Sequence, residues 1–238
     1  MAEPGSHPTE AVLSALPKDV RERWPVAVER AARKAKSVLP DQDANQLVKV
    51  AQKAGTASQR VVWLQRAASA WTKPLAQVAA CRRGCSHCCH ISVTITAVEA
   101  DLIGRHVGIK PVRPSNAIRL QSLMQRDGAV PAVEAISALA APAPCPFLKD
   151  RACSVYEVRP MACRLLLNLD DDDLLCRLVP GQDVPVPYAD ASQLRTLFLM
   201  AQANTPMADI RDFFPARTED AGERRTPELH RLRIRSVP

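Results

Sequence analysis

The eight cysteines of this chain fall into two stretches of the sequence, and this grouping constrains the fold more than any other feature. They are Cys81, Cys85, Cys88 and Cys89 in the first stretch and Cys145, Cys153, Cys163 and Cys176 in the second. Cysteines that only fill a core need no such spacing. We therefore predict that all eight are metal ligands. Because thiolates favour soft or borderline cations, the expected metal is zinc or iron, the latter alone or in an iron–sulfur cluster.

The spacing inside the first stretch leaves the number of metal ions open. Two residues separate Cys85 from Cys88, a gap that lets both thiolates wrap one metal, and Gly84 permits the tight backbone that this needs. Cys88 and Cys89 are adjacent, and consecutive side chains of an extended segment point to opposite sides. This pair favours two metals or a bridged polynuclear site. Two four-cysteine sites and one four-ligand cluster with four further cysteines both remain compatible with the sequence.

Other uses of the cysteines explain less of the pattern. A thioredoxin-like redox pair at Cys85 and Cys88 would leave six thiols without a role. Four disulfides would suit an oxidising compartment, but residues 1–10 lack the basic start and apolar run of a secretory signal. No stretch approaches the roughly 18 apolar residues of a membrane span. We expect a cytoplasmic protein with reduced thiols and no membrane partner.

Several polar side chains lie among the cysteines. With eight thiols available, we expect His87 and His90 to lie beside the metal or to face solvent rather than to bind it. Arg159 and Arg164 are placed to donate hydrogen bonds to sulfur and to offset thiolate charge, with a surface salt bridge as the alternative for Arg159. Tyr156 either donates its hydroxyl in the same way or simply packs.

The rest of the sequence predicts a mostly α-helical fold in three segments. The segments are residues 1–80, read as helices with a break at Gly55, residues 81–178, a cysteine-cluster metal-binding domain, and residues 179–238, a helix followed by a basic tail. Within the metal-binding domain we expect residues 81–96 and 145–176 to pack into a small irregular subdomain. A short β-hairpin between Cys145 and Cys153 would bring these two thiols close together.

Local patterns predict further elements. Ile91–Thr96 alternates like a short strand, and Thr96-x-x-Glu99 is a capping box that opens a helix ending at Gly108. Further helices are expected at residues 114–125, 131–140 and 194–203, with a helical turn at 210–214. Asp170–Asp173 lacks the alternating spacing and the glycine of a calcium loop, which favours a solvated turn.

Charge does not point clearly to a partner other than a metal ion. The net charge is +7, and five arginines lie between residues 223 and 235. Acidic residues interrupt this basic run, and aromatic side chains that could stack on bases are few, so nucleic acid is disfavoured. A solvated tail is the simpler interpretation, and a protein partner is left open.

The cysteine spacing, together with Tyr156-x-x-Arg159-Pro160-x-x-Cys163-Arg164, resembles the YkgJ-type cysteine-cluster family over about residues 81–176. That family is described as a zinc- or iron-chelating domain and is sometimes labelled an iron–sulfur oxidoreductase. The resemblance implies metal chelation by the cysteines. It implies no particular reaction.

Two functions from different classes therefore follow. The first is a metal-binding protein in which an iron or iron–sulfur centre would allow redox chemistry, as an oxidoreductase does. The second is an interaction module in which structural zinc supports a surface for a protein or nucleic acid. Catalytic and cofactor-binding residues are not predicted, because no serine–histidine–acid set, phosphate loop or paired carboxylates stands out.

Overall fold

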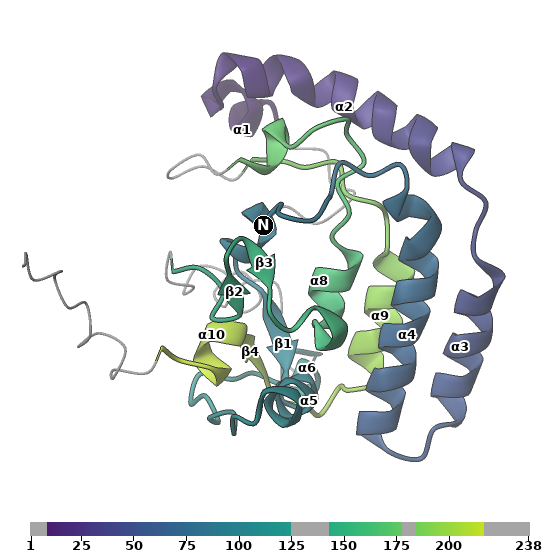
Figure 1. Ribbon diagram of the computed structural model, residues 1–238, viewed down its shortest axis with the longest axis vertical. Coiled ribbons are helices and arrows are strands. Elements are labelled where there is room, and N and C mark those ends of the chain that lie inside the picture. The colour runs from purple at the N-terminus through teal and green to yellow at the C-terminus, as the bar shows by residue number, and fades with distance from the viewer. Residues whose placement is uncertain (1–8, 125–142, 178–183, 217–238) are drawn as a thin grey trace, which may run out of the picture.

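The computed structural model describes residues 9–124, 143–177 and 184–216, and this part of the chain is mostly α-helical, as predicted (Figure 1). The first half contains α1 (Glu10–Ala15), α2 (Lys18–Ser37), α3 (Gln42–Lys53), α4 (Ala57–Ala76), the 3-10 turn η1 (His87–Cys89), β1 (Thr94–Thr96), α5 (Ala97–Val107) and α6 (Leu120–Met124). The second half contains β2 (Leu148–Lys149), β3 (Ala152–Cys153), η2 (Tyr156–Val158), α8 (Met161–Leu165), η3 (Leu174–Cys176), α9 (Ser192–Met200), β4 (Met207–Asp209) and α10 (Ile210–Phe213).

Helix α4 packs against α8, the helix of the second cysteine stretch. The predicted break at Gly55 separates α3 from α4, and a capping box of Thr56 and Gln59 starts α4. The two helices run side by side (Figure 1). One face of α4, including Val61 and Leu64, is buried in a core shared with α8 and α9. This packing fixes α8, which carries Cys163.

A second core lies under β1, α5 and α10. Strand β1 pairs antiparallel with β4, with Ile95 opposite Ala208. Ile95, Ile103 and Phe213 are almost fully buried there. The strand predicted at Ile91–Thr96 is thus confirmed over its last three residues, and α5 begins with the predicted capping box and ends at Gly108, whose φ is +70°.

The predicted hairpin is also present. Leu148 pairs with Cys153, and Lys149 with Ala152, so the turn consists of Asp150 and Arg151 alone. Their φ values are +48° and +60°. Positive φ at both central residues is the type I′ geometry, which glycine and asparagine normally supply. Here residues with larger side chains adopt it, which is why the sequence did not reveal the turn type.

One predicted helix is wrong in its first half. Ser115 and Asn116 form a turn, Ile118 forms a β-bridge, and α6 begins only at Leu120. The backbone of Ile118 instead exchanges two hydrogen bonds with Met207, at 2.9 and 2.7 Å. A residue that extends the β1–β4 pairing cannot also be helical. The helix predicted at 131–140 and the basic tail at 223–235 lie outside the described residues.

The expected helix at 194–203 is α9, and the expected turn at 210–214 is α10. None of the helices in the described segments combines the length and the apolar character that a membrane span requires.

Candidate metal centre

The fold joins the two cysteine stretches directly. The backbone N–H of Cys145 donates to the carbonyl of Cys89 at 2.7 Å, and that of Ala80 donates to the carbonyl of Asn168 at 2.9 Å. A third link joins His87 Nε2 to Asp173 Oδ2 at 3.0 Å. All eight cysteines are half-buried, and none is in a disulfide. The expectation that residues 81–96 and 145–176 pack together is therefore confirmed.

Asn168 connects two of the cysteines at one end of this region. Its side chain is fully buried, and its amide donates to Cys176 Sγ at 3.3 Å and to the Asp172 carbonyl at 2.9 Å. Its backbone also hydrogen-bonds to the sulfur of Cys81. The sequence did not indicate Asn168, because its partners Cys81 and Cys176 are brought to it by the fold and no spacing motif marks such a residue.

Cys81 itself lies outside the preceding helix. Helix α4 ends at Ala76 and does not reach this thiol. Its Sγ lies 3.9 Å from the Leu166 carbonyl, to which the thiol donates.

The other end of the region is built on the hairpin and on α8. Cys145, Cys153 and Cys163 all pack against the core under β1. The first turn of α8 has no side-chain cap of its own, and Glu99 from α5 accepts the N–H of Met161 at 2.7 Å instead. Free N–H groups at a helix start need such a partner. Glu99 therefore fixes the start of the helix that presents Cys163.

Arg159 places a positive charge among the thiols. Its guanidinium carbon lies 4.1 Å from the centre of the Tyr156 ring, and its charge acts to lower the pKa of Cys81, Cys88 and Cys153. Its Nε is buried and has no hydrogen-bond partner. A surface salt bridge would leave no such atom. A buried N–H without a partner, on a guanidinium whose charge acts on three thiols, fits a metal–thiolate centre, because the negative charge of such a centre attracts donors.

The donor set fits the chemistry of zinc or iron, because eight unpaired thiols supply the soft ligands that these metals take. Across the described residues, no three histidine, cysteine or acidic side chains lie where they could hold one metal ion, so the thiols would have to draw closer together around a bound metal.

Residues 80–178 match the family CxxCxxCC, described as "Putative zinc- or iron-chelating domain". This is the YkgJ-type cysteine-cluster family, whose pattern the sequence of this segment resembles. The family's description supports metal binding by the YkgJ-type domain in general terms. No curated protein and no solved structure matches the chain.

Six of the thiols in the YkgJ-type domain have a raised pKa and hold their protons more tightly than free cysteine does. Burial raises the pKa of Cys81, Cys145, Cys153 and Cys163 and brings that of Cys176 to about 12. A hydrogen bond between the adjacent thiols raises the pKa of Cys88 and lowers that of Cys89. Because metals bind thiolates, binding would release protons here.

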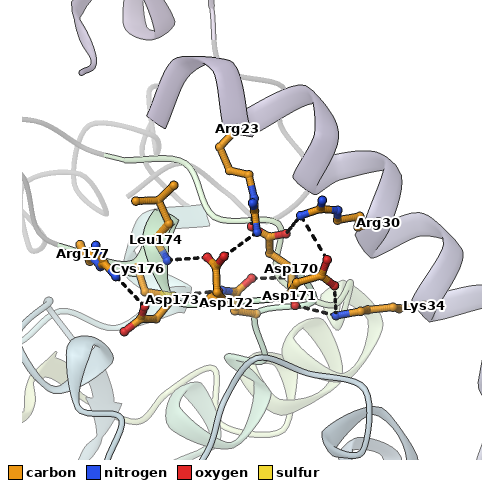
Figure 2. A network of polar contacts seen from close by, with 11 residues as sticks. Arg23, Arg30, Lys34, Asp170, Asp171, Asp172, Asp173, Leu174, Cys176 and Arg177 are labelled. Carbon is orange, nitrogen blue, oxygen red and sulfur yellow. Dashed lines mark hydrogen bonds and ion pairs between the residues drawn. The ribbon is translucent and has the colours of Figure 1, made fainter. Parts of the chain in front are cut away.

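The acidic loop before Cys176 is not the solvated turn that the sequence predicted. Asp170 is fully buried, with Arg23 Nε 2.7 Å from Oδ2 and Arg30 Nη1 3.4 Å from Oδ1 (Figure 2). Asp171 pairs with Lys34 at 3.0 Å and with Arg30 at 3.1 Å. The three cations all lie on α2, which the sequence could not place over this loop. Helix α2 is outside the YkgJ-type domain, yet it holds part of it.

The remaining polar residues act on the backbone around the thiols. Arg164 donates to the carbonyls of Glu157 and Arg159 and to the Ser69 hydroxyl, rather than to sulfur. His87 bonds to Asp173 and thereby tethers η1 to the acidic loop.

Arg211 of α10 is a further residue that the sequence did not indicate. Its guanidinium donates to the carbonyls of Cys89 and Ile91 at 3.3 and 3.1 Å and to that of Ala143 at 2.7 Å. It also pairs with Asp209. Arg211 therefore fastens the end of the first cysteine stretch to the start of the second. Its distance from them along the chain left no local signal.

Proposed function

We propose that this protein binds zinc or iron in the cytoplasm through the thiolates of all eight cysteines. The observation that carries the proposal is the hydrogen bond from the N–H of Cys145 to the carbonyl of Cys89, which joins two separate stretches of thiols that form no disulfide. The family of residues 80–178 supports it. A cytoplasmic location would keep the thiols reduced and available.

The chain's own residues would position the thiols and balance their charge. Asn168 orients Cys81 and Cys176, Glu99 fixes the start of the helix with Cys163, and Arg159 supplies positive charge. Zinc bound here would stabilise the fold, whereas iron would also permit a change of oxidation state. The division into segments 1–80, 81–178 and 179–238 stays a prediction.

Elemental analysis with an absorption spectrum of anaerobically purified protein tests the proposal. We expect near-stoichiometric zinc or iron, and a lower metal content in Cys85→Ser and in Cys88→Ser. Ser86→Ala is the matched control, because it lies between them and provides no thiol. Unchanged metal content in both cysteine variants would refute chelation by these residues.

A redox function is the second candidate, and Arg159 favours it. A guanidinium whose charge acts on several thiols would stabilise the additional negative charge of a reduced iron–sulfur cluster. We expect a visible charge-transfer band that bleaches on addition of dithionite if the centre is redox-active. Colourless protein containing zinc would instead favour the interaction module, in which the metal only supports a protein-binding surface.

A further inference from the structure

The adjacent cysteines Cys88 and Cys89 lie in the 3-10 turn η1. Successive side chains in such a turn point about 120° apart, since it has three residues per turn. The two sulfurs are hydrogen-bonded to each other but face different surroundings. The turn is therefore suited to supply one ligand to each of two neighbouring sites.

One group of cysteines gathers around Asn168. Asn168 contacts the sulfurs of both Cys81 and Cys176, as described above. Gly84, with φ of +88°, and the hydrogen bond from the N–H of Cys85 to the Arg82 carbonyl turn the chain back after Cys81. The thiols are near enough that the charges on Cys81, Cys85 and Cys88 all act on Cys176. The charge on Cys88 also acts on Cys153 and Cys163, so this thiol lies at the boundary between the two groups.

The other group gathers on the hairpin side. The carbonyl of Cys89 accepts the N–H of Cys145, and the carbonyl of Cys145 accepts that of Leu148 at 2.9 Å, next to the pairing of Leu148 with Cys153. Cys163 packs on the same core as these hairpin cysteines. The charges on Cys145, Cys153 and Cys163 all act on Cys89.

We infer that the eight cysteines form two four-cysteine metal sites, split between the neighbours Cys88 and Cys89. The Asn168 set is Cys81, Cys85, Cys88 and Cys176, and the hairpin set is Cys89, Cys145, Cys153 and Cys163. This inference rests on the proposed function and specifies how the ligands divide.

The surroundings of the two sets agree with this division. Four thiolates around one divalent zinc carry a net charge of −2, so two such sites side by side repel each other. Arg159 acts on Cys81 and Cys88 of the Asn168 set and on Cys153 of the hairpin set. Its guanidinium lies where it reduces that repulsion.

Partial removal of zinc from the wild-type protein tests the division without any substitution. The protein is loaded with zinc alone, titrated with a chelator, alkylated and analysed by mass spectrometry. We expect two zinc ions per chain and an intermediate with one, in which the four protected cysteines are one complete set. Protection drawn from both sets in that intermediate, or loss of all protection in one step, would overturn the inference.

Paired variants supply a second measurement. Cys145→Ser with Cys153→Ser removes two ligands of one set, and we expect about half of the wild-type zinc to remain. Cys153→Ser with Cys176→Ser removes one ligand from each set, and we expect less than about a tenth to remain. Equal losses in the two double variants would contradict the division. A wild-type protein that binds neither zinc nor iron would refute the proposed function as well, so the two failures are distinguishable.

Discussion

At the scale of single residues, Asn168 contributes through both its amide and its backbone. Besides Cys81 and Cys176, it serves the acidic loop, since its side-chain oxygen accepts the N–H of Asp170 at 2.9 Å. Every polar group of this buried side chain has a partner. Replacing a residue with so many buried partners lowers stability, because each partner group loses its hydrogen bond, stays buried and cannot bond to water instead.

We expect Asn168→Ala to lower the free energy of unfolding of the metal-free protein by about 2–3 kcal/mol. Zinc affinity should fall as well, because Cys176 loses the hydrogen bond that the Asn168 amide donates to its sulfur. Denaturant unfolding and a competitive zinc titration measure the two effects. Asn116→Ala is the control, because its amide makes a single exposed hydrogen bond to Asp212. Equal effects of the two substitutions would contradict this role.

Arg159 allows a prediction about charge rather than stability. We expect Arg159→Gln to weaken metal binding by about tenfold, because it removes a positive charge that acts on Cys81, Cys88 and Cys153. Arg66→Gln is a matched control, since Arg66 also stacks on an aromatic ring, that of Trp63 at 4.6 Å. Competitive metal titration of both variants measures the difference. If Arg159→Gln bound metal as tightly as Arg66→Gln, the guanidinium would have no electrostatic role at the centre.

At the scale of secondary-structure elements, the β2–β3 hairpin contains a local conflict between sequence and conformation. Asp150 and Arg151 both adopt positive φ. Left-handed backbone costs a non-glycine residue roughly 1 kcal/mol. The hairpin nevertheless forms, because its flanks are fixed by the core on which Cys145 and Cys153 pack.

We expect Arg151→Gly to raise the free energy of unfolding by about 1 kcal/mol, because glycine adopts positive φ without strain. Lys149→Gly, in the adjoining strand, should instead lower it by about 0.5–1 kcal/mol through the greater entropy of the unfolded chain. Thermal unfolding of both variants measures the contrast. A loss of stability in Arg151→Gly would show that the arginine side chain contributes more than the turn costs.

Glu99 links three helices through one buried carboxylate. It completes the capping box of α5, accepts the N–H of Met161 at the start of α8, and accepts from Gln65 of α4 at 3.3 Å. We expect Glu99→Ala to lower the free energy of unfolding by about 2–4 kcal/mol, and Glu99→Gln by less, because glutamine keeps one acceptor oxygen.

The pH dependence of this effect has a definite sign. Burial raises the pKa of Glu99 above its ordinary value of 4.5. The folded protein therefore binds this proton more tightly than the unfolded chain, and Glu99 lowers stability as pH rises from 4.5 towards its higher folded pKa. Glu99→Gln cannot ionise and should lack this slope in unfolding experiments across that range. An identical slope in both proteins would contradict the assignment.

The sequence predicted elements better than it predicted contacts between them. The helix from Thr96 to Gly108 was predictable because both of its ends carry local signals, a capping box and a glycine. The cysteine stretches were likewise evident from spacing alone. The roles of Asn168 and Arg211, and the burial of Asp170, arise from contacts between residues far apart in the chain, which no local pattern encodes.

At the scale of the whole molecule, α2 lies across the acidic loop as an additional support of the cysteine region (Figure 1). Its apolar side packs Val20 and Ala27 against Leu175 in η3, beside Cys176. Its cations surround Asp170 and Asp171. The N-terminal helix and the loop before the last cysteine are thus held by both apolar and ionic contacts.

We expect the double variant Arg23→Ala/Arg30→Ala to lower the free energy of unfolding by about 3–5 kcal/mol, because it leaves the buried Asp170 carboxylate unpaired. Trp24 on α2 is partly buried in the contact with Leu175, so its fluorescence reports separation of the helix. Lys18→Ala is the control, since Lys18 makes only an exposed pair with Glu22. An unchanged Trp24 signal in the double variant would show that apolar contacts alone hold α2.

The hydrogen bonds from Arg211 to the carbonyls of Cys89 and Ala143 can form only late in synthesis of the chain. All eight cysteines leave the ribosome before β4 and α10, which pair with β1 and join the carbonyls of Cys89 and Ala143. Until about residue 213 has emerged, this junction has neither its strand partner nor its guanidinium. More than thirty residues beyond Cys176 must therefore be translated before the scaffold around the thiols is complete. During that interval the two cysteine stretches lack the backbone contacts of Arg211 that join them in the folded protein.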